Sequence, residues 1–283
     1  MGRLLWSPSE SRIKSSLLYN FIRETPLESD SYFDLHRWSI ENMEEFWSHF
    51  WEFSNIIYSK NYDSVLENPV MPGARWFSGS ELNYAENLLS GNKNQVAIIS
   101  TGEGRDDKVL TFGDLKKLVA AAQHGLRDLG VTRGTRIAAF VPNCVETVVL
   151  LLAATATGAI WTSCSPDFGS QGVVDRFGQV EPSIMIVANG YNYNGKTFSL
   201  EQKINKVLDA IDTIENVITI EFADVSCEIR HSSVIGYQNL VSNGDTVPNF
   251  VQLPFDHPLY IMYSSGTTGP PKSIIHGAGG TLV

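Results

Sequence analysis

The sequence predicts an α/β fold in which a parallel sheet is covered by helices on both faces, preceded by a mostly helical, aromatic-rich extension. From about residue 95, short apolar segments of strand length alternate with segments of helical periodicity. The strand-like segments are apolar throughout, which is typical of parallel strands buried on both faces. The first 90 residues differ, because they hold five of the six tryptophans.

Length and charge limit the possible functions. The chain has 283 residues, with 21 Lys+Arg against 31 Asp+Glu, so its formal net charge is −10. At about 150 residues per domain this length predicts two domains, or one large α/β domain with an extension. We place an extension at residues 1–90 and the first part of a larger domain at 91–283. The acidic excess argues against a protein that neutralises nucleic-acid phosphates. It does not exclude small anionic substrates, which are held by local groups.

No disulfide framework, metal site or membrane span is expected. The three cysteines are scattered and form no C-x-x-C pair, so we expect small buried residues. The most apolar stretch, residues 147–161, is shorter than the roughly 18 residues that span a bilayer. It predicts a buried helix followed by a strand. The N-terminus lacks a signal-peptide core, and we expect a cytoplasmic protein.

The extension is expected to contain a helix over residues 39–57. Ser39 is the predicted N-cap, and acidic residues follow in the early turns, where the helix dipole favours them. Aromatic residues at i, i+4 and i+7 spacing form a stripe, made of Phe46, Trp47, Phe50, Trp51 and Phe53. This aromatic stripe either docks the extension on a larger body or stacks on a ligand.

The larger region is expected to alternate strands and helices. Strands are predicted at 96–100, 109–112, 136–141, 159–163, 184–188 and 217–221, helices at 111–129, 143–156, 173–179 and 200–211, and an irregular connection at 223–254. Thr111 and Asp114 predict a capping box, and Gly130 predicts the end of that helix. Asn143 with Glu146 is expected to cap the next one.

The last thirty residues carry groups suited to an anion. An apolar strand at 259–263 runs into SSGTTGPPKS at 264–273, and a short return strand is expected at 274–276. Open α/β sheets bind ligands where such strands end. Glycines let backbone N–H groups approach phosphate oxygens, and hydroxyls add donors. The candidate residues are Ser264, Ser265, Gly266, Thr267, Thr268, Gly269 and Lys272.

Two features qualify this candidate site. Between Leu253 and Val283 the only formal charges are Asp256 and Lys272, so an anion would rest on neutral donors plus one lysine. The run is not a Walker A loop, because Pro271 stands where that motif needs glycine. From the residues alone, a Gly/Pro-rich turn between two strands remains an alternative.

The run from Tyr263 to Lys272 resembles the phosphate-binding signature of adenylate-forming enzymes, the acyl-CoA synthetase and luciferase superfamily. The following SIIHGAGGTL is similar to the acetyl-CoA-synthetase-like members. Other segments resemble the acetoacetyl-CoA synthetases more than the acetyl- and propionyl-CoA synthetases, namely HRWSIENMEEFWSHFWEFS, WFSGSELNYAENLL, GAIWTSCSPDFGSQGVVDRFGQVEPS and YNYNGK. The resemblance runs from about Tyr32 onward.

The resemblance implies an adenylate-forming fold and a two-step ligase reaction. Acetoacetate would react with ATP, accompanied by Mg²⁺, to give an acyl-adenylate and diphosphate, and the thiol of CoA would then displace AMP. It implies that residues 264–272 cover the β- and γ-phosphates, with Lys272 as a catalytic residue, and that Arg176 lies near the CoA phosphates. The implied partners are these small molecules, with no nucleic acid.

Some assignments stay open at this stage. Arg176 is equally interpretable as a helix-surface residue paired with Asp175 or a neighbouring acid, and His276 as either a packed core histidine or a pocket residue. In the implied family, residues for adenine, ribose and a small C-terminal domain follow the phosphate loop. We therefore expect an incomplete adenylate-forming domain whose parent is a ligase and which is inactive alone. The alternatives are a non-catalytic binding fragment and an acetate or propionate ligase.

Overall fold

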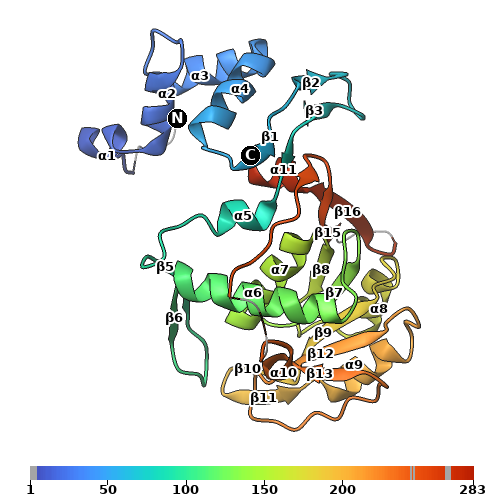
Figure 1. Ribbon diagram of the computed structural model, residues 1–283. Helices are drawn as coiled ribbons and strands as arrows, with labels where there is room; N and C mark the ends of the chain where they lie inside the picture. Colours follow the sequence, from blue (N-terminus) through green and yellow to red (C-terminus); the bar gives the residue numbers. More distant parts are fainter. Residues whose placement is uncertain (1–4, 243, 245, 265–268) are drawn as a thin grey trace. The chain divides into compact units, whose positions relative to one another are not determined.

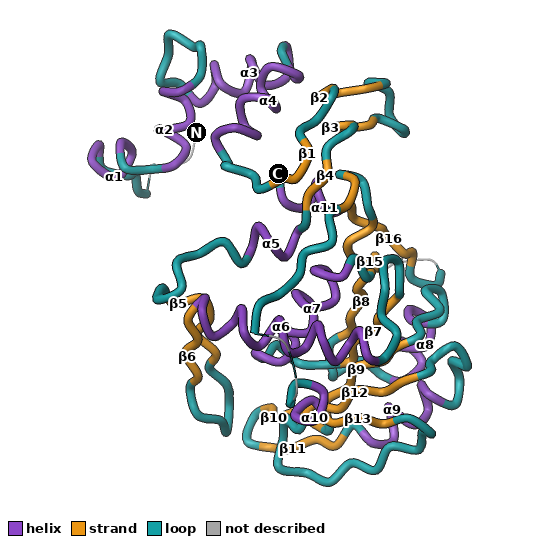
Figure 2. The backbone as a smooth tube through the Cα atoms, in the orientation of Figure 1, coloured by secondary structure: helices purple, strands orange, loops and turns teal. Residues whose placement is uncertain are grey.

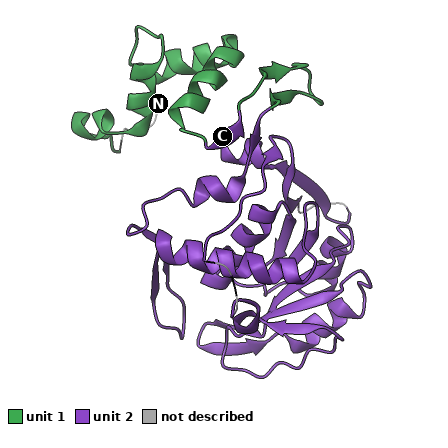
Figure 3. Cartoon of the chain, viewed as in Figure 1, with its two compact units in different colours: residues 1–56, 61–79, 283 green, residues 57–60, 80–282 purple. Residues whose placement is uncertain are grey.

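The computed structural model describes residues 5–242, 244, 246–264 and 269–283 (Figure 1). The chain divides into two compact units (Figure 3). The smaller unit comprises residues 1–56 and 61–79 with residue 283, and the larger comprises residues 57–60 and 80–282.

The described residues of the smaller unit form four helices and a hairpin. Its elements are α1 (Glu10–Lys14), α2 (Leu17–Glu24), α3 (Tyr32–Glu41), α4 (Met43–Phe53), β2 (Ser64–Glu67) and β3 (Arg75–Ser78). The predicted single helix over 39–57 is wrong. Ser39 lies inside α3, where its hydroxyl donates to the His36 carbonyl oxygen at 2.8 Å. The chain breaks at Asn42, with φ −131° and ψ 55°, before α4 begins.

The aromatic stripe packs within this unit. Phe21 of α2 contacts three phenylalanine rings of α4, those of Phe46, Phe50 and Phe53, at centroid distances of 5.8, 5.6 and 5.0 Å. On the hairpin side, Trp51 is buried and stacks on Phe77 at 4.7 Å. One row of rings on α4 thus packs against α2, and another ring packs against β3. These two sets of contacts account for the density of aromatic residues in this part of the sequence.

The larger unit is built on a seven-stranded sheet with the order β13–β12–β9–β7–β8–β15–β16 (Figure 2). Its strands are β7 (Arg136–Phe140), β8 (Ile160–Cys164), β9 (Ile184–Ala188), β12 (Asn216–Ile220), β13 (Val234–Gly236), β15 (Pro258–Ser264) and β16 (Lys272–Gly277). All neighbours are parallel except β15 and β16, which form an antiparallel hairpin. The predicted parallel α/β fold is confirmed, including the return strand.

Helices cover both faces of this sheet. The core on one face includes α6 (Phe112–Asp128), α7 (Val145–Thr157) and α10 (Tyr237–Leu240), and the core on the other includes α8 (Ser170–Phe177) and α9 (Glu201–Leu208). Ile137 and Ala139 of β7 enter the first core, whereas Ala138 and Phe140 enter the second. A strand with two buried faces must be apolar throughout. Among the helices of the described residues, none combines the length and apolar character needed to span a bilayer.

Helix ends follow local sequence signals in one case and depart from them in another. The capping box of Thr111 and Asp114 opens α6, and Gly130 follows its C-cap with φ +82°, as predicted. The predicted Asn143 cap is wrong, because Cys144 is the N-cap of α7 and makes no side-chain cap bond. Instead, the Thr147 hydroxyl donates to the Pro142 carbonyl oxygen at 2.9 Å and stabilises the turn into the helix.

Several short elements were not predicted. They are α5 (Tyr84–Leu88), α11 (Ala278–Leu282), a sheet of β1 (Tyr58–Lys60), β4 (Glu81–Leu82) and β14 (Leu253–Pro254), and the hairpin of β10 (Gly190–Tyr193) and β11 (Lys196–Ser199). The predicted strands at 96–100 and 109–112 form the pair β5 (Val96–Ser100) and β6 (Lys108–Thr111). The segment 223–254 is less irregular than expected, since it holds β13, α10 and β14.

Asn83 joins three segments of the larger unit. It is fully buried, and its side-chain oxygen accepts the Glu86 N–H at 3.2 Å to cap α5. Its amide nitrogen lies 3.3, 3.1 and 2.8 Å from three carbonyl oxygens, those of Thr155, Ala156 and Val251. A buried carbonyl oxygen that loses its hydrogen-bond donor is left unpaired, and the fold then bears the full free-energy cost of removing that oxygen from water.

Replacing this residue tests the contribution of these bonds. We expect Asn83→Ala to lower the free energy of unfolding by about 3 kcal/mol, because it removes a cap and leaves buried carbonyls unpaired. Urea unfolding followed by circular dichroism measures the loss. Asn94→Ala, at an exposed site, serves as the control and should change it by less than about 0.5 kcal/mol. Equal effects of the two variants would contradict this role.

Candidate functional site

The candidate site lies where β8 and β15 end. The two strands are parallel neighbours, with Tyr260 opposite Trp161 and Ile261 opposite Thr162, so the loops that follow them leave the same edge of the sheet. From β8 the chain passes through α8 to β9, on the far side of β7. Open α/β sheets bind ligands at the carboxyl edge where the strand order reverses in this way.

The structure describes three of the seven predicted phosphate-binding residues. Ser264 ends β15 and pairs across the hairpin with Lys272, the first residue of β16. Gly269 is exposed, as is Lys272. The other four, Ser265, Gly266, Thr267 and Thr268, lie outside the described residues. Ser264 and Lys272 therefore face each other at the two ends of the predicted phosphate run.

A cavity of about 750 Å³ adjoins the second end of this run. One lining residue, Asp175, lies on α8, and another, Gln179, follows that helix. The hairpin supplies the other five, which are Gly269, Pro270, Pro271, Lys272 and Ser273. The lining offers an ammonium, a hydroxyl and an amide as donors, together with one carboxylate. These donors are suited to a polar, anionic ligand.

Arg176 lies on α8 with its guanidinium over an aromatic ring. The guanidinium carbon is 4.6 Å from the ring centroid of Phe168 and 5.8 Å from that of Tyr263. Its Nη1 donates to the Gly172 carbonyl oxygen at 2.7 Å. Among the ion pairs of the described part of the chain, none joins Arg176 to Asp175. The surface ion pair considered from the sequence is thus absent.

Tyr263 is held by a chain of hydrogen bonds. Thr162 Oγ1 lies 2.9 Å from both the Ile261 carbonyl oxygen and the Tyr263 hydroxyl. Because the carbonyl has no proton, Thr162 donates to it, and Tyr263 donates to Thr162. Burial raises the pKa of Tyr263 to about 12, so this hydroxyl is neutral at physiological pH.

Burial favours the protonated form of the three cysteine thiols. Burial raises the pKa of Cys164, at the end of β8, to about 11, although the nearby Arg176 charge opposes the shift. Burial also raises the pKa of Cys144 and of Cys227. A thiol must ionise to attack or to bind a metal. Cys144 and Cys164 are buried as expected, and Cys227 is half-buried.

A buried histidine is present, but it is not His276. His276 is half-buried on β16, with its ring centroid 5.1 Å from that of Tyr260. His257, which the sequence analysis did not single out, is only 8% exposed, and its Nε2 lies 3.0 Å from the Gly158 carbonyl oxygen. Burial lowers the pKa of His257, because the charged ring would lose its hydration.

This pKa shift predicts a pH dependence of stability. A histidine in the unfolded chain takes up a proton below about pH 6.5, whereas His257 in the fold does so only at lower pH. The unfolded state then binds more protons, so the free energy of unfolding falls as the pH drops below about 6.5, by at most about 1.4 kcal/mol per unit. Urea unfolding at pH 7.5, 6.5 and 5.5 measures the free energy of unfolding at each pH. His257→Gln keeps a donor but cannot titrate there, so its profile should be flatter. An unchanged profile would contradict the assignment.

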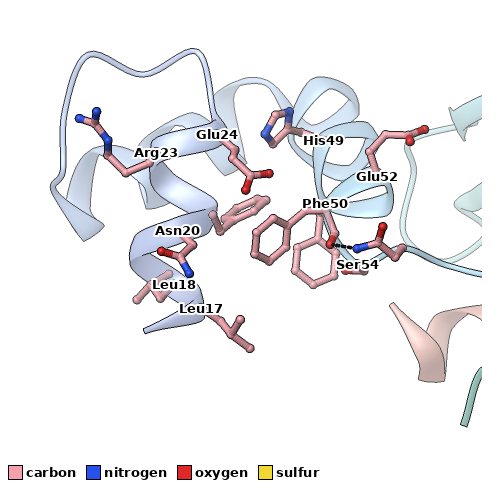
Figure 4. Close-up of a pocket in the computed structure, with 12 residues that line it drawn as sticks. Leu17, Leu18, Asn20, Arg23, Glu24, His49, Phe50, Glu52 and Ser54 are labelled. Carbon is pink, nitrogen blue, oxygen red and sulfur yellow. Dashed lines mark hydrogen bonds between the residues drawn. The ribbon is translucent and has the colours of Figure 1, made fainter. Parts of the chain in front are cut away.

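A second cavity, of about 1000 Å³, lies between α2 and α4 in the smaller unit (Figure 4). Its apolar wall includes Phe21, Phe50 and Phe53, so the aromatic stripe forms core contacts and a cavity wall at once. Leu17 and Leu18 line the same cavity and are exposed. Its rim carries Asn20, Arg23, Glu24, His49, Glu52, Ser54 and Asn55.

Comparison with protein families classifies the chain. Residues 86–283 match the family model described as AMP-binding enzyme, and residues 32–88 match that described as acetyl-coenzyme A synthetase N-terminus. The first match covers well over half of the sequence. The chain therefore belongs to the AMP-binding enzyme family, as the resemblance of its sequence motifs implied.

Within that family, the chain is a homologue of acetoacetyl-CoA synthetase. It is 40% identical to the Xenopus tropicalis enzyme of that name, over 100% of this chain and 44% of the relative. It is also 36% identical to malonamoyl-CoA synthetase of Penicillium aethiopicum, over 99% of this chain and 41% of the relative. The acetoacetyl-CoA synthetase structure from Streptomyces lividans superposes with a TM-score of 0.92 at 35% identity, over 99% of this chain and 44% of that one. The chain thus spans less than half the length of these relatives.

Sequence reasoning assigned no role to several residues that the structure places at this edge. Phe168 carries the Arg176 guanidinium, Thr162 holds Tyr263, and Gln179 contacts the hairpin. Their partners lie about 90 to 100 residues away or across a loop, and no local pattern marks such contacts. The register of β8 against β15 is the information that would have found them.

Proposed function

We propose that this chain is the phosphate-binding part of an acetoacetate–CoA ligase. The reaction is ATP + acetoacetate + CoA to AMP + diphosphate + acetoacetyl-CoA, through an acyl-adenylate. The observation that carries the proposal is the β15–β16 hairpin, which sets Ser264 and Lys272, the two ends of the Ser/Gly/Thr-rich run, at the carboxyl edge of the sheet. The identity to acetoacetyl-CoA synthetases supports this substrate over acetate or propionate.

The chemistry explains why such a run is needed. A carboxylate is a poor electrophile, and a carboxylate oxygen that attacks the α-phosphorus of ATP converts it into a reactive mixed anhydride. Negative charge develops on the departing diphosphate, so donors already aimed at it lower the barrier. We assign that role to the residues from Ser264 to Lys272, with Lys272 as the one cationic donor.

Arg176 is our candidate for the CoA phosphates. A planar guanidinium matches phosphate oxygens and keeps its charge at all relevant pH values. The Arg176 guanidinium uses one of its faces to stack on Phe168 and one of its N–H groups to bond the Gly172 carbonyl oxygen. The remaining N–H groups are then oriented by the protein before any ligand binds.

The described residues contain no cluster of three or more His, Cys, Asp and Glu side chains placed to hold a metal ion. This donor set fits phosphate better than it fits a resident cation. We propose that Mg²⁺ belongs to the site as part of MgATP, where it would neutralise phosphate charge. The chain's own contribution is the set of phosphate donors.

The domain boundary is part of the proposal. We assign residues 1–90 to a helical extension and residues 91–283 to the first part of the AMP-binding domain of a cytoplasmic enzyme. The two family matches meet at residues 86–88, which supports this division. We infer that the acyl pocket comes mostly from the part of the relatives that this chain does not match.

The proposed activity is testable on the native protein. An antibody to residues 1–90 captures it from its source, and intact mass and AMP release are then measured with ATP, CoA and one acid. We expect a species heavier than the 31.3 kDa of this chain, which releases AMP with acetoacetate faster than with acetate or propionate. A faster reaction with either of those acids would make it a short-chain ligase.

The share of the relatives that is matched favours a second candidate, a non-catalytic fragment that binds phosphate compounds. A captured species of 31.3 kDa that releases no AMP would support this candidate and contradict the ligase. The purified 283-residue chain provides the reference for that outcome, and we expect it to release no AMP.

Lys272 gives a sharper test of the site. We expect Lys272→Ala to weaken the binding of diphosphate and MgATP to the 283-residue chain about 10-fold or more, because it removes a charge-assisted contact. Calorimetric titration measures the affinity, and the melting temperature should not change, since Lys272 is exposed. Lys117→Ala, at an exposed site on α6, is the control. Unaltered affinity in Lys272→Ala would contradict its role.

A further inference from the structure

We propose that Gln179 is a positioning residue that fixes Lys272 by holding the two residues on either side of it. Gln179 follows the C-cap of α8 and reaches across to the hairpin, 92 residues away in sequence. The proposal rests on the phosphate-binding function proposed above and adds to it the residue that sets the place of Lys272. Gln179 itself need not touch the ligand.

Three hydrogen bonds define the contact. Gln179 Nε2 donates to the Pro271 carbonyl oxygen at 2.9 Å and to the Asp175 carbonyl oxygen at 2.6 Å. Its Oε1 accepts the Ser273 hydroxyl at 3.1 Å. The amide therefore binds the residue before Lys272 and the residue after it, while a third bond ties the same amide to α8.

The partners determine which way the amide faces. A carbonyl oxygen only accepts, so both carbonyls must meet the NH₂ group, which has two protons to donate. The Ser273 hydroxyl can donate, so it meets the amide oxygen. Each proton and the oxygen then have a partner. A flipped amide would set its oxygen against two carbonyl oxygens and would keep only a bond to the Ser273 hydroxyl. This complementarity leaves the Gln179 side chain one orientation.

The hairpin needs such support at this point. β16 is the last strand of the sheet, so cross-strand pairing holds it from one side, through Ser264 opposite Lys272. Gln179, which is bonded to Asp175 of α8, adds hydrogen bonds to both neighbours of Lys272. The same helix carries Arg176, three residues earlier, with its guanidinium near the ring of Tyr263. One short helix thus sets the positions of both proposed phosphate contacts.

The chain contains a matched control. Gln171 lies on α8, is exposed like Gln179, and donates to the Asp175 carboxylate at 2.7 Å, but within the described part of the chain it makes no hydrogen bond with the hairpin. Titration of the 283-residue chain with diphosphate and with MgATP compares Gln179→Ala with Gln171→Ala. We expect affinity to fall about 5-fold in Gln179→Ala, the equivalent of about one neutral hydrogen bond, and to stay unchanged in Gln171→Ala.

Two further variants separate positioning from a general effect on the fold. Ser273→Ala keeps the bond to Pro271 and should lose less affinity than Gln179→Ala. Gln179→Glu keeps an acceptor for Ser273 but has no amide proton for Pro271, so it should bind no better than Gln179→Ala. The melting temperatures of all four variants should lie within about 2 °C of the parent, because these bonds are exposed.

The outcomes distinguish this inference from the proposed function. If the parent binds diphosphate, Lys272→Ala does not, and Gln179→Ala matches the parent, the positioning role is overturned while the phosphate site stands. If the affinity of Gln179→Ala falls only together with its melting temperature, the residue is structural and the inference is overturned. If neither the parent nor Lys272→Ala binds any phosphate compound, both proposals fail.

Discussion

The pairing of β15 with β8 is the constraint on which the candidate site depends. A register that sets Ile261 opposite Thr162 brings together residues about 100 positions apart in the chain. It aligns the end of β15 with the loop after β8, so Tyr263 meets Arg176 and the hairpin meets α8. The register is itself fixed by burial, because a shift of one residue would turn Leu259 and Ile261, both buried, to the opposite face.

The central sheet is the part of the fold that the sequence predicts well, because β7, β9 and β12 bury both faces and must be continuously apolar. The capping box at Thr111 is equally local and was found. The break at Asn42 was missed, since an unbroken aromatic periodicity runs through residues 46–53 and says nothing about what precedes it. The short strands β10, β11 and β13 were missed because their pairing, not their composition, defines them.

The candidate site also has one part that the sequence predicts and another that only the structure reveals. Glycines, hydroxyls and a lysine in one run indicate a phosphate site from the sequence alone, beside the alternative of a Gly/Pro-rich turn, and the site stays a prediction. What the sequence cannot supply is the support from other elements: Phe168 beneath Arg176, Thr162 beside Tyr263, and Gln179 against the hairpin. Thr162 lies in β8, whereas Phe168 and Gln179 lie in the turns on either side of α8, and only the fold gives each of them its partner.

The position of β16 at the end of the sheet has a consequence for the protein in concentrated solution. An edge strand offers unpaired N–H and C=O groups to any other strand, and apolar side chains make such pairing more favourable. Ile274 and Ile275 are 46% and 63% exposed on this strand, and neighbouring Met262 is 54% exposed. Lysine is a residue that edge strands use against unwanted pairing, and Lys272 opens this one. The charge proposed to attract phosphate thus also discourages self-association along the same edge.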